Sequence, residues 1–236
     1  MDDHPVTLIT GASRGLGLAL ARALAARGHR LVIDARGAVA LERARAELAE
    51  LTEVVAVPGD VASDAHRRTL VVAAERLGRL DALVNNASLL GPSPRPGLVD
   101  HPLDDLERVY RVNALAPLGL VQRALPLLVA SHGRVVNVTS DAGSEAYAGW
   151  GGYGSSKAAL DALTLVLAAE HPELRVYVVD PGDMRTQMHQ EAFPGEDISD
   201  RPDPQQVVPA LVRLVEGELP SGRHRAEDLL AVGGVR

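Results

Sequence analysis

Cysteine is absent from the chain, and this absence excludes disulfides, thiol nucleophiles and cysteine-ligated metal sites. No spacing of His, Asp and Glu suggests a metal cage either, so we expect no metal. No apolar run approaches the roughly 18–20 residues of a membrane span. The N-terminus lacks the basic start and apolar core of a signal peptide. We therefore expect a cytoplasmic protein without a membrane partner.

Aromatic residues are few, and acidic residues outnumber basic ones. A net charge of −7 argues against a nucleic-acid partner and favours solubility. Aromatic residues make up 3% of the chain, and Tyr147, Trp150 and Tyr153 lie close together. This cluster is typical either of a substrate wall or of rings packed in the core. The length suits one large α/β domain spanning residues 1–236.

Short apolar runs alternate with helical patterns along the chain. Each run is continuously apolar, which is typical of strands buried on both faces of a parallel sheet. Alternation of this kind predicts an α/β fold with helices on both faces of that sheet. The expected strands are residues 6–10, 31–33, 54–57, 80–84, 134–138 and 175–179.

A long helical region is expected over residues 103–129, bent near Pro117 and Pro126. Residues 183–204 are acidic and rich in proline and glycine, which predicts a flexible substrate loop over the site. The other expected helices include residues 15–27, 62–77, 153–170 and 205–215, and one that aligns Leu41, Ala44, Leu48 and Leu51 on a single face.

Polar residues and glycines follow the strands at the positions where such sheets bind ligands. Gly11, Arg36, Asp60 and Asn85 each come after an expected strand, and the carboxyl ends of parallel strands share one edge. Glycines in the turn 11–17 let the backbone approach a pyrophosphate, whose charge then meets a helix N-terminus. A nucleotide site is therefore expected, although a plain tight turn would also explain the glycine spacing.

Tyr153 and Lys157 lie four residues apart on an expected helix, so their side chains share a face. A phenol with a pKa of about 10 exchanges protons poorly at neutral pH. A nearby ammonium group favours phenolate and moves this pKa toward the working range, as general acid–base catalysis requires. The pair predicts a proton-transferring centre, provided that a nucleotide site and a further hydroxyl lie beside it.

Together these residues resemble the short-chain dehydrogenase/reductase family over nearly the whole chain. The motifs occur in the family's order, and the thirteen-residue step from Ser140 to Tyr153 is also usual in it. The resemblance implies a Rossmann-type, doubly wound parallel sheet in a single domain. It also implies hydride transfer between a nicotinamide and a carbonyl or secondary alcohol. The matching positions are residues 10–17, Asp60, Val61, residues 85–87, Asn113, Ser140, Tyr153, Lys157, Pro181, Gly182 and Thr186.

The resemblance implies roles for individual residues. Tyr153 would protonate the carbonyl oxygen, and Lys157 would lower the pKa of Tyr153 and hold the nicotinamide ribose. Ser140 would hydrogen-bond the reacting oxygen, unless it is only a strand-end cap. Asn113 would hold a water in a proton relay, unless it is a satisfied buried amide. The cofactor would contact Gly11, Ser13, Arg14, Gly15, Leu16, Gly17, Arg36, Asp60, Val61, Asn85, Ala87, Tyr153, Lys157, Pro181, Gly182 and Thr186.

Two charged residues near the end of the second strand favour different cofactors. A carboxylate at that end bonds the ribose hydroxyls of NAD, whereas an arginine attracts the 2′-phosphate of NADP. Asp34 lies one residue before the position at which NAD-dependent relatives carry the acid, so strand alternation turns it away. Arg36 and Arg14 occupy phosphate-binding positions of the family. NADP(H) is therefore expected, with NAD(H) as the alternative.

The expected substrate wall consists of Tyr147, Trp150, Met184 and Met188. An apolar wall with few polar groups suits a medium-sized ketone or aldehyde. The sequence thus predicts an NADP(H)-dependent carbonyl reductase acting on a small molecule. An NAD-dependent alcohol dehydrogenase is the alternative within enzymes, and a non-catalytic nucleotide-binding module is the alternative outside them.

Two segments depart from the family's usual pattern. Ser88 stands where the family commonly has glycine, and no change of function is attached to it. Residues 221–228 stand where many relatives place a more apolar final strand, which leaves the last strand and its oligomer contacts open. Family members commonly form homotetramers through the helices that hold Asn113 and Tyr153. We therefore expect a homo-oligomer, a dimer or a tetramer.

Overall fold

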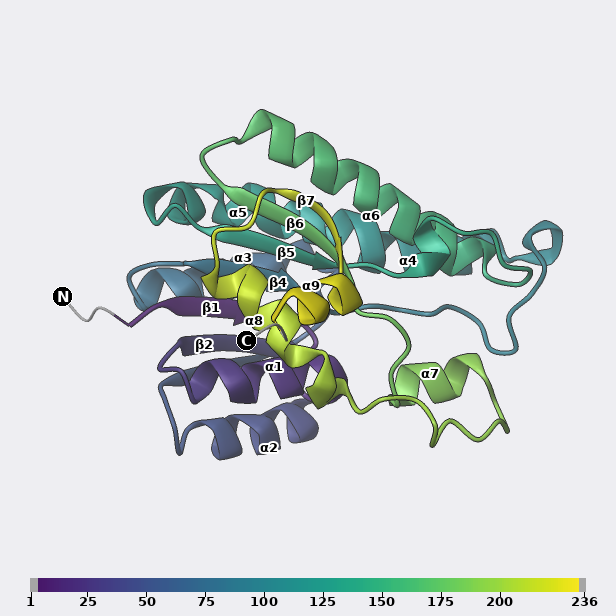
Figure 1. Ribbon diagram of the computed structural model, residues 1–236, viewed down its shortest axis with the longest axis horizontal. Coiled ribbons are helices and arrows are strands. Elements are labelled where there is room, and N and C mark those ends of the chain that lie inside the picture. The colour runs from purple at the N-terminus through teal and green to yellow at the C-terminus, as the bar shows by residue number, and fades with distance from the viewer. Residues whose placement is uncertain (1–3, 234–236) are drawn as a thin grey trace.

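A computed structural model describes residues 4–233 and contains a seven-stranded sheet in which all neighbouring strands run parallel. The strands are β1 (Val6–Ile9), β2 (Arg30–Ala35), β3 (Val54–Pro58), β4 (Ala82–Asn85), β5 (Arg134–Val138), β6 (Arg175–Asp180) and β7 (Gly222–Arg225). Their spatial order is β3-β2-β1-β4-β5-β6-β7 (Figure 1). The chain reverses its direction of travel across the sheet between β1 and β4, where doubly wound sheets bind ligands.

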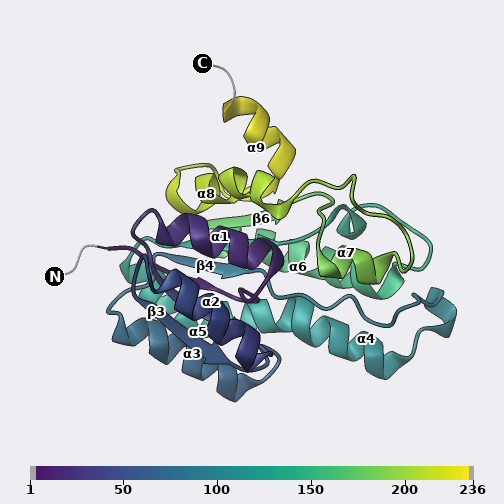
Figure 2. The ribbon, with the colours of Figure 1, turned by 90° about the horizontal axis from the view of Figure 1, so that it is seen from below.

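Helices cover both faces of the sheet. They are α1 (Gly15–Ala25), α2 (Ala38–Leu48), α3 (Asp64–Arg76), α4 (Leu103–Tyr110), α5 (Ala116–Ala130), α6 (Gly151–Glu170), α7 (Gln187–Ala192), α8 (Val208–Glu216) and α9 (Ala226–Gly233). The view from below separates the layers, with α1 and α8 on one side of the strands and α3 and α5 on the other (Figure 2). The expected Rossmann-type fold is confirmed.

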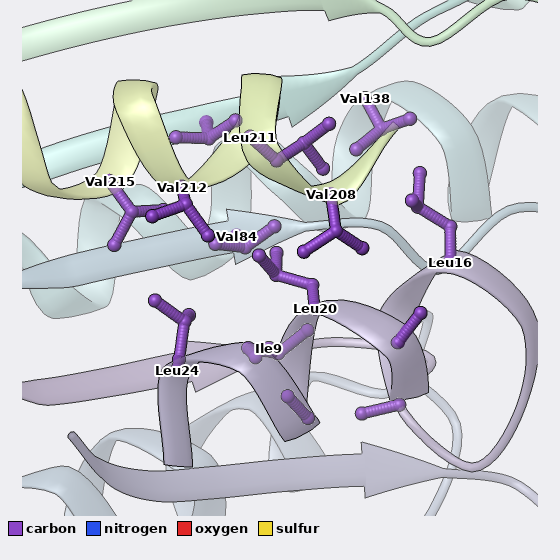
Figure 3. Close-up of a cluster of buried hydrophobic side chains, with 14 of the residues drawn as sticks. Ile9, Leu16, Leu20, Leu24, Val84, Val138, Val208, Leu211, Val212 and Val215 are labelled. Atoms are coloured by element: carbon purple, nitrogen blue, oxygen red, sulfur yellow. The ribbon is translucent and has the colours of Figure 1, made fainter. Parts of the chain in front are cut away.

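The apolar runs of the strands form two cores, one on each face. On the first face, side chains of α1 and α8 such as Leu20, Leu24 and Leu211 pack over the strands around Val84 (Figure 3). On the second face, Leu70 of α3 and residues of α5 belong to a separate cluster. Each fully buried leucine contributes roughly 1.5–3 kcal/mol to folding. The sheet is therefore a rigid platform for the side chains at its carboxyl edge.

The expected strands are all present, with ends that differ by one or two residues. One helix prediction was wrong at its end, because α2 stops at Leu48 and Leu51 is 58% exposed. The long region over residues 103–129 is divided by a π-helical turn, Arg111–Leu115, directly before Pro117. Pro117 lies in the first turn of α5, the part of a helix in which proline is best tolerated. The helix continues through Pro126.

The last third of the chain has more regular structure than the sequence predicts. Residues 183–204, expected as a flexible loop, contain α7, whose N-cap Thr186 accepts a hydrogen bond from His189 N at 3.2 Å. This helix lies beyond the carboxyl ends of the strands (Figure 1). After α8, the polar segment 221–228 does form a strand, β7, and α9 follows it. The polar sequence of β7 suits an edge strand, which is half-buried rather than enclosed.

The helical stretch Leu103–Ala130 is, at 28 residues, long and apolar enough to cross a membrane by length and composition. The expectation that nothing in the chain approaches such a span therefore fails for this helix. Half of its most apolar window is buried inside the protein, and buried core helices pass the same test. The stretch is weak evidence for a span.

Candidate active site

A cleft of about 940 Å³ lies at the carboxyl edge of the sheet. Residues from the glycine turn, from the ends of β2 through β6 and from α6 and α7 line it together. Within residues 4–233, no group of three or more His, Cys, Asp and Glu side chains could hold a metal. The cleft therefore brings the predicted nucleotide site and the predicted proton-transferring centre into one space.

Tyr153 and Lys157 both line the cleft from the first turns of α6. The Lys157 Nζ lies 5.5 Å from the centre of the Tyr153 ring and donates a hydrogen bond to the Val138 carbonyl at 2.8 Å. Glycine permits this approach of the helix to the loop after β5, because a Cβ at Gly154 would lie only 2.4 Å from the Ala142 oxygen. The predicted pair is thus held against the end of β5.

Burial shifts the pKa of both groups. Loss of solvation lowers the pKa of Lys157 to about 8, and the carboxylate of Asp161 opposes this shift. Loss of solvation raises the pKa of Tyr153 to about 12, although hydrogen bonds with Ser88 and Ser140 oppose the rise. The raised pKa is opposite to the direction that the sequence predicts. A phenol with this pKa stays protonated at neutral pH and can therefore donate a proton.

Ser140 lines the cleft at the end of β5, beside Tyr153. Its hydroxyl donates to Asp141 Oδ1 at 2.8 Å and accepts a hydrogen bond from Ala142 N at 3.2 Å. The second bond makes Ser140 the N-cap of the short turn that follows. The serine therefore does cap a strand end, and it also faces the cleft where a reacting oxygen would lie.

Asn113 lies in the π-helical turn, buried and behind the cleft wall. Its Oδ1 accepts from Leu89 N at 2.8 Å and from Ser88 Oγ at 3.2 Å. Its Nδ2 donates to the Leu89 carbonyl and to Ser156 Oγ, each at 2.9 Å. The side chain is thus a satisfied buried amide that joins the π-turn to α6. The water relay stays a prediction from family resemblance.

Ser88 has a place in the site that the sequence reasoning missed. Its hydroxyl donates to Asn113 Oδ1 at 3.2 Å, and its interaction with the Tyr153 phenol opposes the rise in the pKa of Tyr153. The signal was available in the sequence, because a hydroxyl replaces the family's usual glycine at this position. The additional hydroxyl thus bonds Asn113 and acts on the pKa of Tyr153.

The glycine turn fits a phosphate group. Gly11 has φ of +68°, and a Cβ there would lie 2.9 Å from the Ala87 Cα. The N-cap Arg14 makes no side-chain cap bond to the first turn of α1 within residues 4–233, and that turn contains no acidic residue. The backbone N–H groups at the start of α1 are therefore directed at the cleft, and the positive end of the helix dipole lies behind them.

Most predicted cofactor residues line the cleft, and two do not. Gly17 lies behind the turn, because a Cβ there would be 2.5 Å from Asn86 Nδ2. Asn85 is buried, and its amide donates to Asn137 Oδ1 at 2.7 Å inside the sheet. Both lie behind the residues that line the cleft, and direct cofactor contact by these two stays a prediction. The residues that do line the cleft are Gly11, Ser13, Arg14, Gly15, Leu16, Arg36, Asp60, Val61, Ala87, Tyr153, Lys157, Pro181, Gly182 and Thr186.

Asp34 and Arg36 differ sharply in their surroundings. Asp34 is 1% exposed; its Oδ1 accepts from Gly11 N at 2.8 Å, and its Oδ2 bonds His66 Nε2 at 2.9 Å. Arg36 is exposed on the cleft wall. The acid at the end of β2 thus holds the glycine turn in place, while the guanidinium group faces the space beside it.

The expected substrate residues also divide into those that line the cleft and one that does not. Trp150, Met184 and Met188 line the cleft. Tyr147 does not, because its hydroxyl donates to Glu145 Oε2 at 2.7 Å and to Asp141 Oδ2 at 3.1 Å on the outside of the loop. The ring of Trp150 instead packs edge-on against Tyr153, with ring centres 5.7 Å apart. Three of the four expected members therefore line the cleft, and their contact with a substrate stays a prediction.

Comparison with known proteins agrees with this geometry. The model of the short chain dehydrogenase family matches residues 5–197, and the chain belongs to that family. It is 37% identical over 196 residues to a 3-oxoacyl-[acyl-carrier-protein] reductase of rhamnolipid biosynthesis from Pseudomonas aeruginosa, covering 78% of this chain and 74% of the relative. It is 34% identical over 221 residues to an (S)-benzoin-forming benzil reductase of Saccharomyces cerevisiae, covering 89% and 81%.

Solved structures share the fold. An alcohol dehydrogenase of the archaeon Thermococcus sibiricus, solved with 5-hydroxy-NADP, superposes with a TM-score of 0.85 and 28% identity over 94% of this chain and 96% of that one. Family membership, the fold and the site together define an NAD(P)-dependent oxidoreductase that acts on CH–OH or C=O groups.

Proposed function

We propose that the protein is an NADP(H)-dependent reductase of ketones or aldehydes. The observation that carries this proposal is the contrast at the end of β2, where Asp34 is engaged by Gly11 and His66 while Arg36 is exposed on the cleft. A carboxylate that bonds the glycine turn is not available to the ribose hydroxyls of NAD. An exposed guanidinium beside the nucleotide cleft attracts a 2′-phosphate.

The chain's own residues suit the reductive direction. The nicotinamide, when bound, supplies the hydride. Tyr153 is a neutral phenol at pH 7, as a phenol is at its ordinary pKa and at the raised one, so it has a proton to donate to the carbonyl oxygen as the alcohol forms. Lys157 stabilises the phenolate left behind, and Ser140 hydrogen-bonds the oxygen as its negative charge develops.

The substrate class follows from the wall of the cleft. Trp150, Met184 and Met188 present an aromatic ring and two flexible thioethers, which pack against apolar groups of varied shape. The named activities of the two relatives, which act on a diketone and on a 3-oxoacyl group, support a ketone. We therefore assign a medium-sized apolar ketone as substrate.

Exposed apolar side chains support an oligomer. Leu103, Leu115, Leu165 and Val166 lie on or next to α4, α5 and α6 with exposed fractions of 45–77%. A second copy that packs on these helices would bury them and would match the family's usual assembly. We propose a homo-oligomer in the cytoplasm. A solution mass equal to that of the monomer would contradict the assembly, and fractionation of the source cells tests the location.

Steady-state kinetics test the activity. We expect the purified protein to oxidise NADPH in the presence of an aromatic 1,2-diketone or a 3-oxoacyl thioester, with a higher kcat/KM for NADPH than for NADH. The control is the same assay without a ketone. Oxidation of secondary alcohols with NAD at a higher kcat/KM than ketone reduction with NADPH would contradict the proposal.

A further inference from the structure

Arg223 lies in the segment that departs from the family pattern. It is the second residue of the edge strand β7 and pairs in register with Val178 of β6. Side chains alternate along a strand, so its neighbour His224 faces the other way, with its ring 5.6 Å from that of Tyr177. Arg223 therefore extends over the face of the sheet opposite to His224.

The guanidinium of Arg223 connects three elements of the site. Its Nε donates to Asp161 Oδ2 on α6 at 3.1 Å. Its Nη2 donates to the Ser140 carbonyl at 3.3 Å and to Ser144 Oγ at 3.4 Å. The same nitrogen lies 3.9 Å from Asp180 Oδ2 at the end of β6. An arginine fork can hold several acceptors at once, which a lysine cannot do in the same geometry.

Asp161 connects this arginine to the catalytic helix. It follows Lys157 by four residues and Tyr153 by eight, so the three side chains lie along one face of α6. Its carboxylate favours the charged form of Lys157. Its Oδ1 is buried without a hydrogen-bond partner among the described residues, so the bond from Arg223 reaches only its other oxygen.

The charges around the site come from several elements. Asp161 faces Lys157 from α6, and the Val138 carbonyl faces it from β5. Asp180 at the end of β6 and Asp141 after β5 both raise the pKa of Tyr153. Arg225 lies on β7, as Arg223 does, and its positive charge acts to lower the pKa of both of those carboxyl groups.

We propose that Arg223 is a positioning residue for carbonyl reduction, which holds the Ser140 loop in place and bonds the Asp161 carboxylate one helical turn beyond Lys157. The inference rests on the proposed function. Arg223 itself does not line the cleft. It acts through Ser140, whose position determines the hydrogen bond to the reacting oxygen, and through Asp161, whose charge reaches Lys157.

The chain offers a direct probe, because Lys157 is its only lysine. Protein labelled with 13C at the lysine ε-carbon gives one side-chain NMR signal, and its pH titration reports the pKa of Lys157. Asp161→Asn should lower this pKa, because a neighbouring negative charge is removed. Arg223→Gln should raise it, because the carboxylate then acts on Lys157 without a competing cation. Opposite signs are the result expected from a carboxylate that bonds Arg223 and acts on the pKa of Lys157.

Kinetics supply the second readout. Arg223→Gln should lower kcat roughly 10-fold to 100-fold, the size of effect that follows a misplacement of about 1 Å at a reacting group. The Kd of NADPH should stay as in the unchanged protein. Arg223→Lys keeps the charge without the fork, so it should recover only part of kcat; it is read by kinetics alone, because it adds a second lysine.

Arg175→Gln is the matched control. Arg175 is at the amino end of β6, away from the cleft, and its guanidinium lies 3.7 Å from Glu218. The control should leave both kcat and the pKa of Lys157 unchanged. Unchanged values in Arg223→Gln, or a shift in the same direction as in Asp161→Asn, would overturn the inference. Failure of the proposed function would look different, because the unchanged protein would then reduce no ketone with NADPH.

Discussion

The two ends of the cleft use charge in different ways. At the cofactor end, Arg36 is exposed, and the one buried acid, Asp34, is bonded to Gly11 and His66 within the protein. At the catalytic end, Lys157 is buried, and loss of solvation shifts its pKa and that of Tyr153. The first arrangement attracts a charged ligand at low cost to the fold. The second prepares individual protons for transfer and destabilises the fold in doing so.

This difference indicates that one set of residues determines the affinity for the cofactor and another set determines the catalytic rate. Exposed cations act through screened attraction, so each one adds a modest amount of binding energy. A buried group acts in a medium of low dielectric constant, where its protonation state is set by few neighbours. Substitutions at the cofactor end should therefore change Kd, and substitutions at the catalytic end should change kcat.

The largest expected effect is that of Tyr153→Phe. The variant keeps the ring and loses the proton donor, so kcat should fall by roughly 10²–10⁴-fold. The Kd of NADPH should remain close to that of the unchanged protein, because the exchange leaves the cofactor end intact. Steady-state kinetics and calorimetry measure the two quantities. A variant that still turns over at the original rate would show that another group is the acid.

Lys157→Met should lose activity and yet gain stability. Because burial lowers the pKa of Lys157 from 10.5 to about 8, the charged lysine destabilises the folded protein. Its removal should raise the free energy of unfolding by about 1–3 kcal/mol at pH 7. The gain should be full below about pH 8 and disappear above about pH 10.5. Denaturant titrations at several pH values measure it, and a loss of stability at pH 7 would contradict the account.

Arg36→Ala should weaken the binding of NADPH roughly tenfold, consistent with about 1.5 kcal/mol for an exposed charged hydrogen bond. The affinity for NADH should hardly change, since NADH has no 2′-phosphate. Arg43→Ala is the matched control, because Arg43 is exposed on the neighbouring α2 and does not line the cleft. Equal losses for both cofactors, measured by calorimetry, would mean that the phosphate is held elsewhere.

The smallest expected effect is that of Tyr147→Phe. The Tyr147 hydroxyl bonds Glu145 and Asp141 outside the cleft, so its loss should change kcat and KM by less than about twofold. The same chemical exchange six residues later, at Tyr153, should lower kcat by roughly 10²–10⁴-fold. If Tyr147→Phe raised KM severalfold instead, the loop around it would have to close on the substrate during the reaction.

Much of the fold and the site was predictable from local sequence. Continuous apolar runs give the parallel sheet, and glycines that need a positive φ or a close contact, such as Gly11, identify the nucleotide turn. The spacing of Tyr153 and Lys157 places both on one helix face. These features depend on residues close together in the chain, which is why the sequence reveals them.

Other features depend on contacts between distant residues. The buried state of Asp34 requires His66, thirty-two residues away, and the direction of the Tyr153 pKa shift depends on how much water the folded cleft admits. The polar segment of β7 becomes a strand because it pairs with β6, not because of its own propensity. Tyr147 was assigned to the substrate wall by its nearness in sequence, and only the loop conformation turns it outward.

The central claim, that the cofactor end selects NADP(H), is tested most directly by titrating the purified protein with NADPH and NADH in parallel calorimetric experiments. The account predicts that NADPH binds at least about tenfold more tightly, the contribution expected of one exposed arginine. Tighter binding of NADH would contradict it, because Asp34 would then have to leave Gly11 and His66 to bond the ribose.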